Sequence, residues 1–262
     1  SDTALTFTVS NVTGGHFAWA SSPQAMISNF SQNQISTNQV AFIHDSGEAA
    51  PSYDVAVSDG NSSTVAAAAT ISFTNVNDAP LLAALGGDSQ TITNNGTAVP
   101  VDVGSVATLV DRDLPGNYNG ATLVVTGNSF DVLDVLGIST AGSISLSAGV
   151  SDGSTLSIGG TAVGTLSSTS SSGMTITFNP NSTATDVEAI LRETTFESTS
   201  LTLGSRSVDF VFNDGDGTAN GGSDTSSIST ANIAVASGDD GLVATDEDVV
   251  YTFGASDFHF TG

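Results

Sequence analysis

Hydrophobic and polar residues alternate along much of this chain, with an apolar side chain at every second position. The alternation is clearest in residues 5–9, 53–57, 71–73, 174–178, 208–212 and 249–253. A period of two predicts β-strands that are buried on one face. Clusters of Gly, Asn, Asp and Ser, such as Gly14-Gly15 and Asp59-Gly60, separate these segments and favour turns. The pattern therefore predicts an all-β chain of antiparallel β-sandwiches.

One segment has helical periodicity. Val187, Ile190 and Leu191 fall on one face of residues 185–193. Thr185 and Glu188 have the spacing of a capping box. We expect one short crossover helix, packed on a sheet edge.

The chain contains an internal repeat. Residues 52–60 align without gaps to residues 207–215, and both segments end in an Asp-Gly turn. Phe30, Ile35 and Phe42 likewise correspond to an apolar series from Phe178 to Phe196, which predicts strand, short helix and strand in both copies. The second copy is longer, and residues 156–166 around Gly159-Gly160 are expected to form an inserted hairpin.

Composition excludes several classes of function. The chain has 3 Lys plus Arg and 27 Asp plus Glu, for a net charge of −24, which disfavours nucleic acids and anionic membranes as partners. It has no cysteine for disulfides, and no apolar run long enough for membrane insertion. The histidines are dispersed and no Gly-x-Ser-x-Gly motif occurs, so we expect no enzymatic activity.

The segment between the two copies reads Asn-Val-Asn-Asp-Ala-Pro over residues 75–80. This segment resembles the linker of cadherin-like repeats in large bacterial extracellular adhesins. Residues 5–78, with Gly15-His16-Phe17 and Ser58-Asp59-Gly60, resemble the chondroitin sulfate proteoglycan repeat, which is itself cadherin-like. Residues 81–236, with Asp111-Arg112-Asp113, resemble a longer module of the same adhesins. The resemblance implies tandem cadherin-like sandwiches at the bacterial cell surface, rigidified by Ca²⁺ and without a catalytic role.

The modules are expected at residues 1–80 and 81–237, and the first lacks its opening strand. Residues 246–260 resemble that opening, with an acidic pair followed by an aromatic strand, but they stand at the opposite end of the chain. Residues 238–262 would therefore complete residues 1–80 of an adjacent unit. This arrangement predicts a head-to-tail filament, in which units are either continuous in one chain or joined by strand exchange.

Calcium is the expected cofactor, because Ca²⁺ prefers hard oxygen ligands and this chain carries many Asp and Asn residues in its turns. By the resemblance, one junction would combine Asn75, Asn77 and Asp78 with Asp59, Asp111 and Asp113. A second junction would combine Asp214, Asp216, Asp239, Asp240 and Glu247. For any single Asp-Gly pair, a turn aspartate that hydrogen-bonds its own backbone is the alternative interpretation.

The expected function is therefore that of a structural repeat or filament unit of a bacterial surface adhesin, with copies of itself as partners through residues 246–262. Two alternatives stay open at this point. One is an adhesin module that binds carbohydrate or protein, such as cell-surface or matrix glycans. The other is an accessory domain of a secreted enzyme.

Overall fold

The structure is a computed structural model that describes residues 5–113, 117–237, 250 and 252. The chain divides into two compact units, and the division falls between Asn77 and Asp78. Residues 219–221 (η2, Ala219–Gly221) belong with the N-terminal unit. The sequence boundary was expected three residues later, at Pro80. In the part of the chain that the structure describes, no helix is long and apolar enough to cross a membrane.

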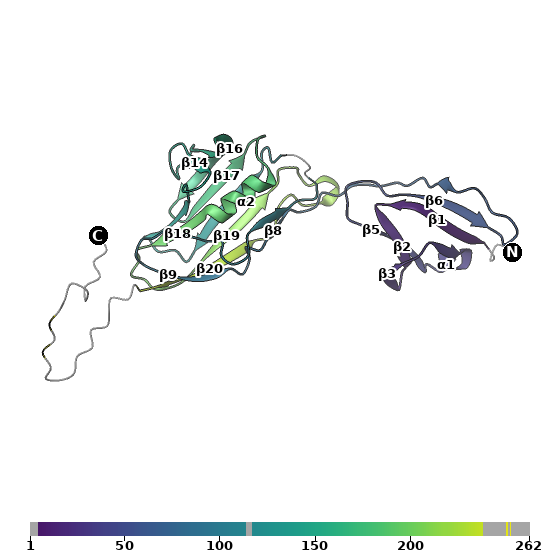
Figure 1. Cartoon of the computed structure of the whole chain (residues 1–262), viewed down its shortest axis with the longest axis horizontal. Coiled ribbons are helices and arrows are strands. Elements are labelled where there is room, and N and C mark those ends of the chain that lie inside the picture. Colours follow the sequence, from purple (N-terminus) through teal and green to yellow (C-terminus); the bar gives the residue numbers. More distant parts are fainter. Residues whose placement is uncertain (1–4, 114–116, 238–249, 251, 253–262) are drawn as a thin grey trace. The chain divides into compact units, whose positions relative to one another are not determined.

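The N-terminal unit consists of two antiparallel sheets (Figure 1). The first has the order β4 (Asn29–Ser31), β1 (Thr6–Thr13), β6 (Ser52–Ser58) and β7 (Ala67–Ala68). The second has the order β3 (Ser22–Met26), β2 (Gly15–Trp19) and β5 (Val40–His44), and helix α1 (Gln32–Ser36) connects β4 to β5. Val9, Phe17 and Phe30, which come from β1, β2 and β4, form its small buried core. The two sheets therefore pack face to face.

The C-terminal unit is larger and is also built from facing sheets. Its main sheet has the order β14 (Ile144–Leu146), β15 (Thr155–Ile158), β16 (Thr161–Ser170), β17 (Gly173–Phe178), β12 (Thr122–Asn128), β19 (Gly204–Asn213), β20 (Ser229–Ala236) and β9 (Ser89–Thr93). The smaller sheets are β10 (Val99–Pro100), β18 (Thr194–Ser198) and β13 (Asp134–Ile138), and β11 (Thr108–Val110) with β8 (Leu81–Ala83). The expected hairpin is confirmed as β15–β16, and the pair β20–β9 is parallel.

Helix α2 (Ala184–Glu193) connects β17 to β18, which lie in different sheets. Val187, Ile190 and Leu191 are buried, as the periodicity predicts. The capping box lies two residues earlier than expected: Thr183 is the N-cap, and its backbone N–H donates to the Asp186 carboxylate at 2.9 Å. The prediction of Thr185 and Glu188 is wrong because Glu188 points to β11, where it accepts a hydrogen bond from the Leu109 N–H at 3.1 Å.

The two units share one arrangement of strands. The order β4-β1-β6-β7 corresponds to β17-β12-β19-β20, and in both units a helix follows the first of these strands. The repeated aspartates have the same role, since Asn11 donates to Asp54 at 2.7 Å and Asn128 donates to Asp209 at 2.8 Å. Asp54 pairs with Ala68 and Asp209 pairs with Thr230, so Ala68 and Thr230 are equivalent positions.

This equivalence shows what the N-terminal unit lacks. Strand β9 continues the main sheet beyond β20, and no described strand of the N-terminal unit lies beyond β7. Residues 71–73, which were expected to form a strand, have no ladder partner in the described part of the chain. The equivalent residues of β20 pair both with β9 and with the start of β19, whereas β6 begins only at Ser52, so residues 71–73 have no described strand on either side. The expected strand at residues 249–253 lies largely outside the described residues.

Candidate metal centre

Several acidic residues of the C-terminal unit lie at one end of the unit, near its first residue, Asp78. Strand β8 pairs antiparallel with β11 so that Leu81 lies opposite Val110, which places Asp111 beside the start of β8. Asp214 follows the last residue of β19. The loops after β11 and β19 therefore converge on the beginning of the unit.

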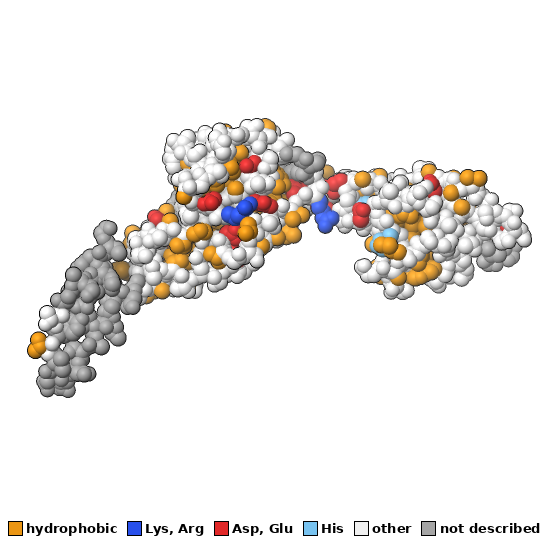
Figure 2. Space-filling model, in the orientation of Figure 1, with side chains coloured by type: hydrophobic (Ala, Val, Ile, Leu, Met, Phe, Trp, Pro, Cys, Tyr) orange, Lys and Arg blue, Asp and Glu red, His pale blue; other side chains and the backbone are white. Residues whose placement is uncertain are grey.

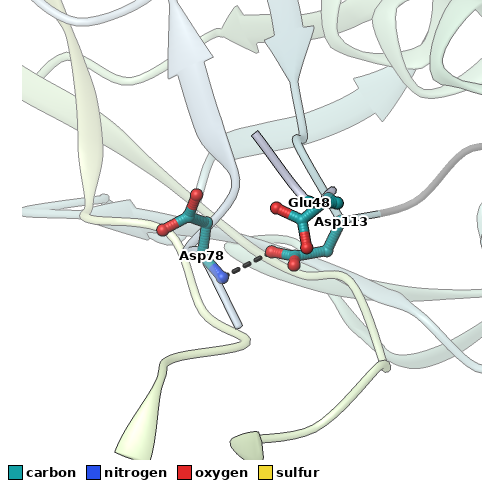
Figure 3. Close-up of side chains that lie close together, drawn as sticks. All are labelled: Glu48, Asp78 and Asp113. Atoms are coloured by element: carbon teal, nitrogen blue, oxygen red, sulfur yellow. Dashed lines mark hydrogen bonds between the residues drawn. The ribbon is translucent and has the colours of Figure 1, made fainter. Parts of the chain in front are cut away.

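The first half of the site is a chain of hydrogen bonds between acidic residues. The backbone N–H of Asp78 donates to the carboxylate of Asp113, as the dashed line in Figure 3 shows. The backbone N–H of Asp113 in turn donates to Oδ1 of Asp111 at 3.1 Å. Glu48, which Figure 3 also draws, belongs to the N-terminal unit. These bonds hold the Asp-Arg-Asp loop against the first residue of the unit.

The second half of the site is Asp214, whose side chain is 2 % exposed. Its burial follows from the strand period, because Phe210, Phe212 and Asp214 are alternate residues and the two phenylalanines are in the core. Oδ1 accepts a hydrogen bond from the Asp216 N–H at 3.2 Å, whereas Oδ2 has no hydrogen-bond partner among the described residues. A buried carboxylate oxygen without a partner is costly unless a cation or a proton neutralises it.

The electrostatics of Asp214 reflect this position. Burial, together with the nearby carboxylates of Asp216 and Asp111, raises the pKa of Asp214 to about 8. Tyr118 lies in the same cluster, with its ring edge-on to Phe212 at a centroid distance of 5.2 Å. Burial raises the pKa of Tyr118 well above its usual value, and the carboxylates of Asp111 and Asp214 add to the effect. The cluster therefore has an excess of negative charge in a poorly solvated position.

This arrangement is suited to a hard divalent cation. Carboxylate oxygens from closely spaced loops are the ligands that Ca²⁺ prefers, and they repel one another when no cation is bound. Hydrogen bonds and electrostatic interactions connect Asp78, Asp111, Asp113, Asp214 and Asp216 within the C-terminal unit, although among the described residues the ligand atoms of Asp111, Asp214 and Asp216 do not all lie within 4.8 Å of one another. The burial of Asp214 could have been predicted from its place in the alternation after Phe212.

The expected grouping of Asp214 and Asp216 with Asp239, Asp240 and Glu247 includes residues beyond β20. Because β20 is antiparallel to β19, Val235 near the end of β20 lies opposite Gly204 at the start of β19, at the end of the strand pair away from Asp214. Asp239, Asp240 and Glu247 lie outside the described residues. Asp214 and Asp216 instead join Asp111.

Asp59 is likewise not brought to the linker. It follows β6, and its carboxylate accepts hydrogen bonds from the backbone N–H groups of Asn61 at 2.9 Å and Ser62 at 2.7 Å. These bonds lower the pKa of Asp59, which is exposed. Asp59 is therefore a turn residue. Asp59 follows the last residue of β6, whereas Glu48, which contacts the linker residue Asn75, comes before the first residue, Ser52. A strand of this length spans about 20 Å, so Asp59 lies at the end of β6 away from that contact.

The linker asparagines make contacts within the N-terminal unit. The Asn75 side chain donates to the carboxylate of Glu48, and the Asn75 carbonyl accepts from the Asn220 side chain at 2.5 Å. The backbone N–H of Asn77, which is a buried residue, donates to the Ala219 carbonyl at 3.4 Å. Sequence reasoning missed Glu48, because nothing in a loop of this composition marks it as a partner of a residue 27 positions away.

Comparison with known proteins gives a sequence match to one family and matches to four solved chains. The profile of the Cadherin_3 family, described as cadherin-like, matches residues 1–73. A search of curated proteins returned no match. A solved structure titled "BspA_C_WT" is 11% identical over 88% of this chain and 84% of its own, with a TM-score of 0.24, which is too low to establish a common fold. Residues 1–73 of this chain are thus cadherin-like in sequence, as the resemblance at the linker and in the first module predicts.

Proposed function

We propose that this chain is a structural repeat unit of an extracellular bacterial surface protein, with a Ca²⁺ site at the beginning of its C-terminal unit and without catalytic activity. The cadherin-like sequence of residues 1–73 and the two related β-sandwich units support a role as a spacer in a row of modules. The strongly acidic composition is consistent with a protein that works in the presence of divalent cations.

The observation that carries the calcium proposal is the buried, unpartnered oxygen of Asp214 next to other carboxylates. A bound Ca²⁺ would neutralise Asp214 and connect the loop after β19 to the loop after β11. Residues Asp111, Asp113, Asp214 and Asp216 would supply ligands from this unit. The ion would thereby stiffen the end of the unit that receives the linker.

The calcium proposal is tested by the thermal stability of the full chain during a Ca²⁺ titration. Extracellular sites of this kind have dissociation constants of about 10⁻⁴ to 10⁻³ M, so 10 mM Ca²⁺ should stabilise the native state by about 1.4–2.7 kcal/mol. Asp214→Asn should abolish this response. Asp152→Asn is the matched control, because Asp152 is a carboxylate of the same unit that accepts hydrogen bonds from Thr169 away from the site. Equal responses of the wild type and Asp214→Asn would contradict the proposal.

We further propose that the units assemble head to tail, with the N-terminal unit of one completed by the residues that follow the C-terminal unit of the previous one. The β7 edge of the N-terminal sheet, which no described strand covers although β9 covers the equivalent edge of β20, supports this assembly. Sedimentation velocity of the full chain over a 100-fold range of concentration would measure it. Growth into species larger than a dimer is the expected result, because such a contact does not close on itself. A chain that stays monomeric throughout would argue against non-covalent assembly.

A further inference from the structure

The N-terminal unit is open to solvent along a hydrophobic groove of about 370 Å³ between its two sheets. Strands of both sheets line this groove, with residues that include Phe7, Phe17, Phe30, Phe42, Tyr53 and Ala69. Figure 2 shows hydrophobic side chains exposed over a broad area of this unit. Phe17 and Phe30 are buried, whereas Phe7, Phe42 and Tyr53 are only partly buried, so the groove has the chemistry of an incompletely covered core.

The C-terminal unit shows which element fills the equivalent space there. Strand β9 runs parallel to β20, with Ile92 beside Val235, and both side chains are buried. Because Ala68 is equivalent to Thr230, residues Ile71 and Phe73 are equivalent to Ile233 and Val235. Ala69, which comes just before these residues, lines the groove, so a counterpart of β9 would pack at the margin of the groove.

The edge that such a strand would join is exposed and unpaired. The backbone N–H of Ala69 still donates to the Tyr53 carbonyl at 2.9 Å, but no ladder continues beyond this residue. Ile71 and Phe73 are only half-buried, although Ile233 and Val235 are 2 % and 3 % exposed. An unpaired edge beside a hydrophobic groove is the arrangement that accepts an added strand.

We infer that this groove binds residues 249–253 of a second copy of the chain as a strand parallel to residues 70–74. Alternation places Val249, Tyr251 and Phe253 on one face of that strand, and this face enters the groove. The inference rests on the proposed head-to-tail assembly and identifies its contact. It also predicts the order of the completed sheet, which would become that of β17-β12-β19-β20-β9.

The assignment to a second copy follows from the proposed head-to-tail assembly. Binding of residues 249–253 within the same molecule is the competing outcome that the test below distinguishes.

The test uses the full chain with Tyr251→Asp and Phe253→Asp, and a synthetic peptide of residues 246–262. Trp19 is the only tryptophan, it packs against the core of the N-terminal unit, and the peptide contains none. Tryptophan fluorescence therefore reports directly on peptide binding to this unit. Saturable binding of the peptide is the expected result.

Two altered peptides make the test specific. A peptide with Tyr251→Ala and Phe253→Ala should bind about 30-fold more weakly or worse, as is typical when buried aromatic anchors are truncated. A peptide with Val250→Ala, changed on the opposite face, should bind like the original. The inference is overturned if the original peptide does not bind, or if all three peptides bind equally.

The same variant separates this inference from the assembly proposal. If the substituted chain still assembles as the wild type does and the peptide does not bind, assembly uses another contact and the inference fails. If the wild-type chain binds the peptide but stays monomeric, the groove is confirmed as the binding site and non-covalent assembly is refuted. A monomeric wild-type chain that refuses the peptide, while the substituted chain binds it, would show that the chain fills its own groove and would overturn the assignment to a second copy.

Discussion

The most informative perturbation in this protein is Asp214→Asn, measured without calcium. The pKa of Asp214 is raised to about 8 in the folded state, whereas its unfolded value is close to 3.8. Between these two values the folded state holds a proton that the unfolded state has lost. Stability therefore falls as the pH rises through this window, at about 1.4 kcal/mol for each pH unit.

From pH 5 to pH 7, the contribution of this carboxyl group alone amounts to a loss of about 3 kcal/mol. For a domain of this size, that loss corresponds to a decrease of roughly 6–12 °C in the melting temperature. An asparagine side chain has the same shape and does not titrate, so the stability of Asp214→Asn should lack this component. Asp216→Asn should give an intermediate result, because the carboxylate of Asp216 is one of the causes of the raised pKa.

The assay is urea denaturation of the wild type and each variant at pH 5, 6 and 7 in the presence of a chelator. The difference in slope between wild type and variant isolates Asp214 from the other carboxyl groups. In calcium, the wild type should bind the ion more tightly as the pH rises, with release of about one proton at pH 7. Parallel pH profiles for the wild type and Asp214→Asn would refute the claim that this carboxyl group is buried without a partner.

Two further predictions concern the scaffold of the C-terminal unit. The buried ion pair of Arg206 with Asp134, at 2.5 Å, connects β19 to β13. Arg206→Ala should therefore lower the free energy of unfolding, measured by urea denaturation, by about 3–5 kcal/mol, and Arg192→Ala, at the exposed pair with Glu188, by less than about 1 kcal/mol. Equal losses for the two variants would contradict this prediction. Gly215 and Gly217 both have positive φ, but only at Gly215 would a Cβ lie 2.9 Å from the Ala121 nitrogen. Gly215→Ala should therefore be less stable than Gly217→Ala by about 1–3 kcal/mol. A difference near zero would show that the loop moves to accommodate the added methyl group.

Local sequence patterns predicted strands correctly where the structure also provides a neighbouring strand for pairing. Residues 174–178 and 208–212 alternate and lie in β17 and β19, in the centre of the main sheet. Residues 71–73 alternate equally well and form no strand, because a strand needs a neighbour for its backbone hydrogen bonds. The same alternating pattern thus forms a strand in one place and not in another, depending on whether another segment of the chain lies beside it.

The candidate metal centre shows the limit of reading residues in chain order. The sequence identified Asp214 and Asp216 as candidates but grouped them with the residues that come next along the chain. An antiparallel pair such as β19–β20 reverses direction, so the end of β20 lies beside the start of β19, away from Asp214. The partners of Asp214 instead come from the loop after β11, about 100 residues earlier, and only the packing of the sheets brings them close.

The sequence by itself determined the all-β architecture, the two related modules, the helix of residues 184–193, the absence of disulfides and the acidic character, because these depend on periodicity and composition. Only the tertiary structure decided which carboxylates meet, which of them is buried without a partner, and which sheet edge and groove of the N-terminal unit are left uncovered. The physical reason is that burial and pairing depend on contacts between segments far apart in the chain, and a local pattern of side chains does not contain that information.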